Sequence, residues 1–309
     1  MKKIGRLLTA MITPFDEKGA VDYEQAKKLA RALLDSGSEG VLVVGTTGES
    51  PTLIRTEEVR LFREIKKVVA GRGAVIAGTG SNSTAEAVEA TREAERAGVD
   101  ACLLVVPYYN KPTQEGLYQH FKTIADSTTL PCILYNVPSR TVTSLSAETV
   151  IKLSRIDNII GIKEASGNLE QIARIISGAK KDFLVWSGND GDTLPILAIG
   201  GYGVISVASH LVGNQISEMI YSFINGRVNE AARMHRSLMP IFSAMFVVSN
   251  PIPVKYALNQ VGFRVGSPRP PLCEPDEKSA AVIRETLKQY KIDLPLPVSR
   301  KKAAVKKRA

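Results

Sequence analysis

Cysteine, histidine and tryptophan are scarce in this chain of 309 residues, which has three, three and one of them. No C-x-x-C pair occurs, and the histidines have no ligand-like spacing to one another or to the cysteines. These absences argue against a disulfide scaffold and against a metal site, so we expect none. No apolar run approaches the roughly 20 residues of a membrane-spanning helix. Because the composition is otherwise ordinary for a globular protein, we expect a cytoplasmic location and no membrane partner.

The excess of positive charge is concentrated at one end of the chain. The net charge is +9, but the last ten residues hold six of the 40 basic residues and no acidic residue. We therefore predict that residues 295–309 form a disordered basic tail, because they have no apolar face. The remainder is close to neutral, so nucleic acid is not expected as a partner.

Short apolar segments alternate with stretches of helical spacing along the first two thirds of the sequence. We expect strands to begin near Leu7, Gly40, Ala74, Ala101, Cys132, Ile159, Phe183 and Gly203. Eight strands with crossover helices predict an α/β protein with a (β/α)8 TIM barrel over residues 1–213. A helical region over 214–294 follows. An open doubly wound sheet is the alternative, but residues 78–83 lack the third glycine of a dinucleotide fingerprint.

A lysine at the end of an apolar run is the residue that most limits the possible kinds of reaction. Residues 159–163 read Ile-Ile-Gly-Ile-Lys, a β-branched segment too short for a typical helix, and they predict a buried strand. A buried lysine tends toward the neutral amine that attacks carbonyl groups. Gly161 shares a strand face with Lys163, and we expect the space there to admit a small ligand. A lysine that snorkels into water is the competing interpretation.

Polar residues gather at the other expected strand ends, where the chemistry of a TIM barrel lies. These ends supply residues 45–50 (GTTGES), 107–110 (PYYN), 135–141 (YNVPSRT), 187–190 (SGND) and 205–206 (IS). Each segment alone has a simpler interpretation. The threonines could satisfy a turn, the tyrosines could pack, and Arg140 could pair with a surface carboxylate. Glu49 and Asp190 could be solvated acids or helix caps.

Together, these residues have the parts for imine chemistry on a keto acid. A neutral Lys163 could attack the carbonyl carbon, and Tyr135 could move protons as the carbinolamine forms and collapses. The hydroxyl and N–H groups of the 45–48 turn suit one carboxylate, and Arg140 suits a second. Lowering the pKa of a lysine by about 2–3 units raises its neutral fraction several-hundred-fold. Because no metal-ligand cluster is present in the sequence pattern, a metal-dependent aldolase is disfavoured.

Four motifs closely resemble the dihydrodipicolinate synthase family. They are GTTGES at 45–50, PYYNKP at 107–112, YNVPSRT at 135–141 and GIKEASG at 161–167, and the resemblance extends from about residue 4 to residue 294. It implies a lyase in which Lys163 forms a Schiff base with pyruvate. The resulting enamine attacks L-aspartate 4-semialdehyde on the route to diaminopimelate and lysine. The resemblance implies no cofactor, because the covalent imine of pyruvate with Lys163 takes that role.

The resemblance also implies a proton relay and an assembly. It makes Tyr135 the general acid and base, and it places Thr47, Tyr135 and Tyr109 in the relay. Tyr109 would reach into the site of a neighbouring subunit. A homotetramer, built as a dimer of dimers, is expected.

The substrate-binding residues follow from the same resemblance. Thr46 and Thr47 would contact the carboxylate of pyruvate, Arg140 would anchor the carboxylate of the semialdehyde, and Gly188 and Ile205 would line the pyruvate pocket. Sister enzymes with the same lysine and tyrosine cleave N-acetylneuraminate or 2-keto-3-deoxy sugar acids, and Arg140 favours the synthase over them. A non-catalytic binding protein on the same barrel is a more remote alternative.

One part of the sequence departs from the family. Relatives inhibited by lysine bind it at the interface of the tight dimer, and Asn82, Glu86 and Tyr108 match the family pattern of that possible allosteric site. Three further residues do not match the lysine-sensitive pattern: Pro51, Arg55 and Glu58. We therefore expect lysine inhibition to be weak or absent.

Overall fold

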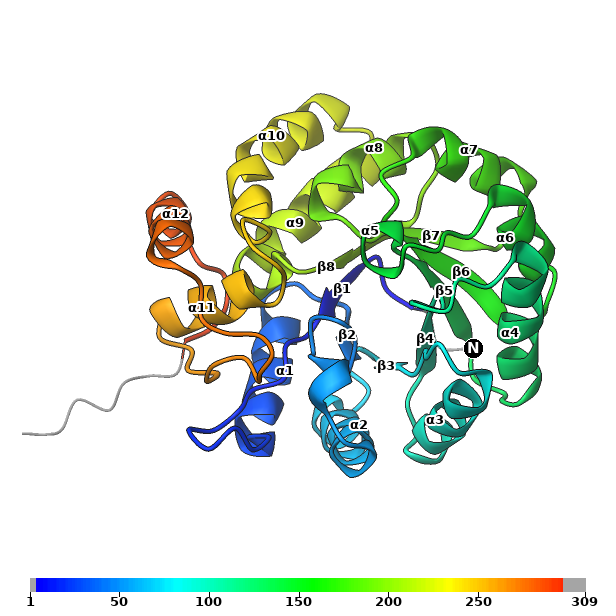
Figure 1. Ribbon diagram of the computed structural model, residues 1–309. Coiled ribbons are helices and arrows are strands. Elements are labelled where there is room, and N and C mark those ends of the chain that lie inside the picture. The colour runs from blue at the N-terminus through cyan, green and yellow to red at the C-terminus, as the bar shows by residue number, and fades with distance from the viewer. Residues whose placement is uncertain (1–3, 297–309) are drawn as a thin grey trace, which may run out of the picture.

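Eight parallel strands close into a barrel in the order in which they occur in the sequence (Figure 1). The computed structural model describes residues 4–296. The strands are β1 Leu7–Ala10, β2 Gly40–Val43, β3 Ala74–Gly78, β4 Ala101–Val105, β5 Cys132–Asn136, β6 Ile159–Glu164, β7 Leu184–Ser187 and β8 Gly203–Ser206. The predicted TIM barrel is confirmed, and the open sheet is excluded by the pairing of β1 with β8. Most of the predicted basic tail lies outside the described residues.

Helices between the strands form the outer ring of the barrel (Figure 1). They are α1 Tyr23–Asp35, α2 Arg55–Val69, α3 Thr84–Arg96, α4 Gln114–Asp126, α6 Ala147–Leu153, α7 Leu169–Gly178, α8 Thr193–Ala198 and α9 Ser209–Ile224. Side-chain caps begin several of them. Ser83 accepts a hydrogen bond from the Glu86 N–H, and Ser146 accepts one from the Thr149 N–H. Such caps satisfy N–H groups that the first helical turn leaves unpaired.

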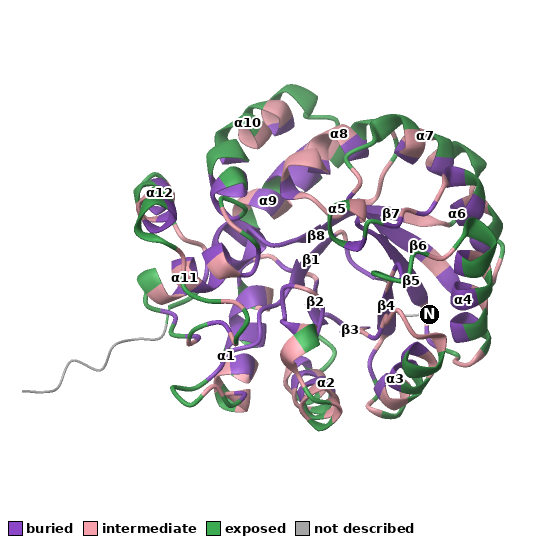
Figure 2. Cartoon of the chain, in the orientation of Figure 1, coloured by how far each residue is buried: buried purple, intermediate pink, exposed green. Residues whose placement is uncertain are grey.

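Alternating side chains of the strands build two apolar layers. One face packs inside the barrel, where the cluster includes Leu42, Ile76, Ile133 and Trp186. The other face packs against the helices, whose outer sides are exposed (Figure 2). The strands are therefore buried on both faces, as a parallel sheet requires, and polar side chains reach solvent mainly at the strand ends.

The C-terminal region adds α10 Val228–Ala244, α11 Ile252–Gln260 and α12 Glu277–Leu287. In Figure 1, α11 and α12 lie outside the ring, on the side of α1 and α9. Helix α9 packs against β1 and α10 and continues past residue 213. The backbone of this helix is non-helical at Val212, with φ of −127°, so the helix is kinked next to the boundary that we placed after residue 213. Its contacts with α10 join the appendix to the barrel.

Candidate active site

Lys163 lies near the carboxyl end of β6, and its side chain is enclosed. Only 5% of the residue is exposed, and the ammonium nitrogen is 4.4 Å from the centre of the Tyr135 ring on β5. Burial lowers the pKa of Lys163 to about 8; the Asp190 carboxylate opposes this shift, and the Arg140 charge adds to it. The interpretation of Lys163 as a snorkelling surface residue is therefore wrong, and its neutral form is accessible near neutral pH.

The space beside Gly161 is filled by protein, so our expectation of a ligand there is wrong. A Cβ on Gly161 would lie 2.7 Å from Cζ3 of Trp186 and 2.3 Å from the carbonyl oxygen of Leu184. The indole N–H of Trp186 donates to the carbonyl oxygen of Gly5 at 2.9 Å. Glycine is needed at residue 161 because the fully buried indole packs across the strand.

Tyr135 is the closest aromatic partner of Lys163 on the neighbouring strand. Burial raises the pKa of Tyr135 to about 12, while the charge of Arg140 and a hydrogen bond with the Thr46 side chain lower it. The phenol therefore keeps its proton at neutral pH. This places a proton donor beside the amine, as acid catalysis of imine formation requires.

The two adjacent threonines have different partners, which changes the relay that we inferred. The side chain of Thr46, and not that of Thr47, lies near enough to Tyr135 to lower the pKa of its phenol. The Thr47 hydroxyl oxygen instead accepts a hydrogen bond from Nδ2 of Asn250 at 2.9 Å. The loop has left-handed backbone at Val44 and Glu49, so it does not follow the simple alternation of a strand. We expected Thr47 in the relay, and Thr46 takes its place in the relay that we propose below.

Arg140 comes from a one-turn helix that the sequence did not indicate, α5 (Pro138–Thr141), which begins with proline. Its Nη2 donates to the backbone carbonyl oxygen of Asn250 at 3.1 Å. A cavity of about 150 Å³ brings together most of the predicted residues. Its lining includes Thr46, Thr47, Tyr135, Arg140, Lys163 and Gly188. Ile205 is fully buried within β8 and is not among the lining residues.

Two acids at strand ends are buried, and the solvated interpretation is wrong for both. Asp190 accepts hydrogen bonds from the Ser206 hydroxyl and, at 3.1 Å, from the N–H groups of Val207 and Ala208. Burial raises its pKa, and these hydrogen bonds partly offset the rise. Asp190 therefore ties the end of β7 to the end of β8 and places a carboxylate in the field of Lys163.

Glu49 pairs with the second buried lysine of the barrel mouth. Its Oε1 is 2.7 Å from Nζ of Lys255, and neither side chain is more than 1% exposed. Oε2 of Glu49 accepts from the N–H of Arg269 at 2.8 Å. Burial lowers the pKa of Lys255, whereas Glu49 raises it. Lys255 is thus held by a carboxylate, unlike Lys163, for which no side-chain ion pair within 4 Å occurs among the described residues.

Asn250 is a polar cavity residue that sequence reasoning missed. It lies between α10 and α11, outside every strand end, and no motif marks it. Tyr109, like Ile205, is a predicted site residue that does not line the cavity. It is 90% exposed and has a left-handed backbone, with φ of 73°. A single copy of the chain leaves this tyrosine facing solvent.

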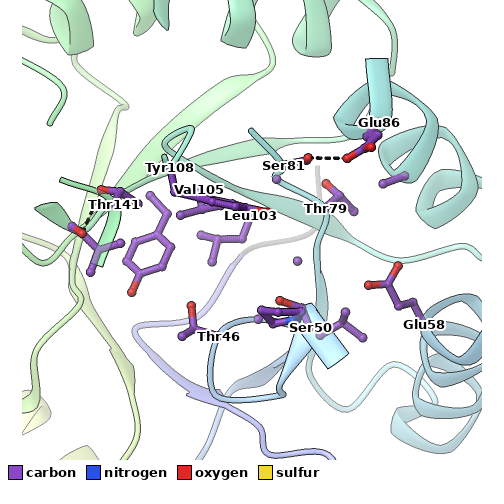
Figure 3. A pocket seen from close by; sticks show the side chains of 18 of the residues that line it. Thr46, Ser50, Glu58, Thr79, Ser81, Glu86, Leu103, Val105, Tyr108 and Thr141 are labelled. Carbon is purple, nitrogen blue, oxygen red and sulfur yellow. Dashed lines mark hydrogen bonds between the residues drawn. The ribbon is translucent and has the colours of Figure 1, made fainter. Parts of the chain in front are cut away.

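A larger cavity of about 350 Å³ has Thr46 and Glu58 in its lining (Figure 3). It shares Thr46, Tyr135 and Arg140 with the first cavity. Glu86 and Tyr108 line it, and Nδ2 of Asn82 donates to the Tyr108 carbonyl oxygen at 3.2 Å. The three residues that depart from the family line it as well: Pro51, Arg55 and Glu58. The possible allosteric residues are thereby gathered beside the candidate active site.

Arg55 and Glu58 give this cavity a charge distribution of its own. Nη1 of Arg55 is 2.7 Å from Oε2 of Glu58, and Nε of Arg55 is 3.4 Å from Oε2 of Glu93. Burial raises the pKa of Glu58 to about 7, with Arg55 opposing and Glu93 adding to the rise. A cation entering here meets the guanidinium of Arg55, which already forms an ion pair with Glu58.

Within residues 4–296, no group of three or more histidine, cysteine, aspartate or glutamate side chains is placed to hold a metal ion. Among the helices of the same residues, none is long and apolar enough to cross a membrane.

Comparison with known proteins gives matches along almost the whole chain. The model of the dihydrodipicolinate synthetase family matches residues 3–290. A 4-hydroxy-tetrahydrodipicolinate synthase of Dehalococcoides mccartyi is 67% identical over 296 residues, which cover 96% of this chain and 100% of the relative. The enzyme of that name from Moorella thermoacetica is 54% identical, with 91% and 98% covered.

Solved structures agree with these sequence matches. A dihydrodipicolinate synthase from Bacillus anthracis superposes with a TM-score of 0.92 at 46% identity, covering 94% of this chain and 100% of the other. One from Cyanidioschyzon merolae with lysine bound has a TM-score of 0.91 at 48% identity, covering 93% and 98%. At these identities, the likeness extends beyond the barrel architecture that many unrelated enzymes share.

Proposed function

The chain belongs to the dihydrodipicolinate synthetase family and has the lyase activity of a 4-hydroxy-tetrahydrodipicolinate synthase in lysine biosynthesis, and from this premise we propose how its residues carry the reaction. Pyruvate and L-aspartate 4-semialdehyde are the proposed substrates. The observation that carries the proposal is the enclosed Lys163, whose burial lowers its pKa to about 8. Its amine lies beside the Tyr135 ring, and Lys163 lines the same cavity as Arg140.

The first stage is imine formation. The neutral Nζ of Lys163 attacks the C2 carbonyl carbon of pyruvate, and the oxygen takes a proton from the Tyr135 phenol to give a carbinolamine. The nitrogen then returns a proton to the Tyr135 phenolate, and Tyr135 passes it to the new hydroxyl, which leaves as water and produces the protonated imine. Thr47 and the N–H groups of its loop bind the pyruvate carboxylate. Removal of a proton from C3 then gives the enamine.

The second stage forms the new carbon–carbon bond. C3 of the enamine attacks the aldehyde carbon of the semialdehyde, whose carboxylate is bound by Arg140, and the aldehyde oxygen becomes a hydroxyl by taking a proton. The amino group of the semialdehyde then attacks the imine carbon and displaces Nζ of Lys163. The product is released as a ring, and the lysine is regenerated.

Tyr135 must be reprotonated during this cycle, and we assign that task to a relay through Thr46. Its side chain lowers the pKa of the Tyr135 phenol. Tyr109 would complete the relay from a second copy of the chain in a dimer of dimers, which would explain its exposure of 90%. Dilution of the enzyme tests this arrangement. Activity per chain should fall as the oligomer dissociates, while pyruvate trapping by Lys163 persists.

The proposed reaction needs no separate cofactor, because the protonated imine itself withdraws electrons from C3 of pyruvate. Activity should therefore be unchanged after treatment with a chelator and desalting. A cytoplasmic location is proposed as well, since the substrates are metabolic intermediates.

Borohydride trapping tests the role of Lys163. Reduction in the presence of pyruvate should add one reduced pyruvate unit to the peptide that contains Lys163. Lys255 is the matched internal control, because it is equally enclosed but paired with Glu49. A Lys163→Arg variant should acquire no adduct. An adduct on Lys255, or none in the wild-type enzyme, would contradict the proposal.

A further inference from the structure

Asn250 joins the two halves of the candidate site, although it belongs to neither the strands nor their following loops. Its side-chain Nδ2 donates to the Thr47 hydroxyl oxygen at 2.9 Å. Its backbone carbonyl oxygen accepts from Nη2 of Arg140 at 3.1 Å. Asn250 is 5% exposed and lines the same cavity as Lys163. A single residue of the C-terminal region thus contacts both side chains that would bind the substrate carboxylates.

The direction of the hydrogen bond to Thr47 has a chemical consequence. A hydroxyl group has one proton to donate, whereas an ionised carboxylate can only accept. Because the amide N–H of Asn250 donates to Thr47, the hydroxyl proton of Thr47 is not used on Asn250. It is free to point toward the cavity, which is the orientation that a bound carboxylate requires.

We propose that Asn250 is a positioning residue for the pyruvate site, which fixes the Thr47 hydroxyl as a hydrogen-bond donor to the carboxylate of pyruvate. This inference rests on the proposed function of the cavity and adds to it a residue supplied by the appendix. Asn250 does not touch the reacting carbon and acts through Thr47.

The surrounding contacts show that the appendix fixes the position of this loop. Two residues after Thr47, Glu49 is bound by Lys255 of α11 at 2.7 Å and by the N–H of Arg269 at 2.8 Å. On the barrel side, the Thr13 hydroxyl donates to the Gly48 carbonyl oxygen at 2.6 Å. Since the loop is anchored on both sides, a side chain from the α10–α11 connection can orient one hydroxyl without moving the backbone.

Asn250 also lowers the stability of the fold, which a residue with a purely structural role would not do. Its Oδ1 is buried and has no hydrogen-bond partner among the residues that the structure describes. A buried acceptor without a partner disfavours folding, and such costs are found mainly where function requires them. The unpaired oxygen is the consequence of using the amide as a donor toward Thr47.

Steady-state kinetics of Asn250→Leu and Asn250→Asp test the inference. Leucine removes the donor at similar size, and we expect the KM for pyruvate to rise about tenfold to a hundredfold, the range for one hydrogen bond to a charged group. The KM for the semialdehyde should change less than about twofold, because Arg140 contacts only the backbone of residue 250. Aspartate is nearly isosteric but accepts the Thr47 proton, so it should weaken pyruvate binding further.

Two controls separate positioning from a loss of structure. Asn259→Asp alters another asparagine of the appendix, whose side chain bridges Gly266 and Val265 and does not line the cavity. It should lower the melting temperature without changing the KM for pyruvate. In a Thr47→Val background, Asn250→Leu should add no further increase in that KM, because the hydroxyl through which it acts is absent.

Two results would overturn the inference. One is unchanged pyruvate KM in Asn250→Asp, which would mean that Thr47 donates to residue 250. The other is a full effect of Asn250→Leu in the Thr47→Val background. Either result, obtained while borohydride still traps pyruvate on Lys163 of the wild-type enzyme, would leave the proposed function standing. Absence of that adduct in the wild type would refute the proposed function instead.

Discussion

Replacing Lys163 by methionine should abolish activity and, at neutral pH, stabilise the protein. The folded chain holds the Lys163 pKa at about 8, against an ordinary value of 10.5, chiefly through burial. One pKa unit corresponds to about 1.4 kcal/mol. At about pH 7 the folded state therefore keeps a protonated lysine at a cost of roughly 3 kcal/mol, and methionine, a chain of similar length, removes that cost.

The stability difference between Lys163→Met and the wild type should depend on pH. Below about pH 8 the lysine is protonated in both states, so the full cost applies. Between about pH 8 and pH 10.5 the folded state releases the proton before the unfolded state does, and the wild-type protein gains stability as pH rises. The advantage of Lys163→Met should therefore fall from roughly 3 kcal/mol at about pH 7 to roughly 1.5 kcal/mol at about pH 9.5.

Urea unfolding of both proteins at the two pH values measures the difference. Lys255→Met is the matched control, since it replaces the other fully enclosed lysine of the site. That change strands the Glu49 carboxylate, so we expect destabilisation by about 3–5 kcal/mol, opposite in sign. If Lys163→Met were no more stable than the wild type at neutral pH, or if its advantage did not shrink at higher pH, burial would not be what lowers the pKa of Lys163.

Tyr135→Phe should lower kcat by about a hundredfold to ten-thousandfold, because proton transfer to the carbinolamine loses its donor; an unchanged rate of borohydride-trappable imine formation would contradict this role. Arg140→Lys should raise the KM for the semialdehyde at least about tenfold, since a single ammonium cannot replace bidentate carboxylate binding, while a larger effect on pyruvate would reverse our assignment of the two carboxylates. Lysine should inhibit weakly or not at all in steady-state assays, because Arg55 already occupies the carboxylates of Glu58 and Glu93. Full inhibition at sub-millimolar lysine would be evidence against that reading of the larger cavity.

The strands and their order were predictable because each carries its own signal. Seven of the eight expected starts coincide with the structure, and the expected start at Phe183 differs from β7 by one residue. A parallel strand buried on both faces is a short apolar run, which the sequence displays without reference to its neighbours. The candidate residues at strand ends were predictable for the same reason, since barrel topology brings all eight ends together.

The individual contacts were not predictable, because they depend on segments that are distant in sequence. We propose Thr46 as the relay threonine because its side chain lowers the pKa of Tyr135, although the adjacent threonines of the motif look equivalent in sequence. Trp186 occupies the space beside Gly161, and only the registration of β6 with β7 reveals it. Asp190 looked like a solvated acid because its three donors come from the end of the next strand.

The sequence by itself determined the barrel, the lysine and the class of chemistry, since these follow from local apolar patterns and from motifs at strand ends. Tertiary structure alone decided which of the two buried lysines is paired with a carboxylate. Lys163 and Lys255 are both enclosed, yet Glu49 accepts from Lys255, across 206 residues of sequence. Tertiary structure also supplied Asn250, 203 residues from the threonine that it contacts. A pKa and the direction of a hydrogen bond depend on neighbours in space, and folding alone determines those neighbours.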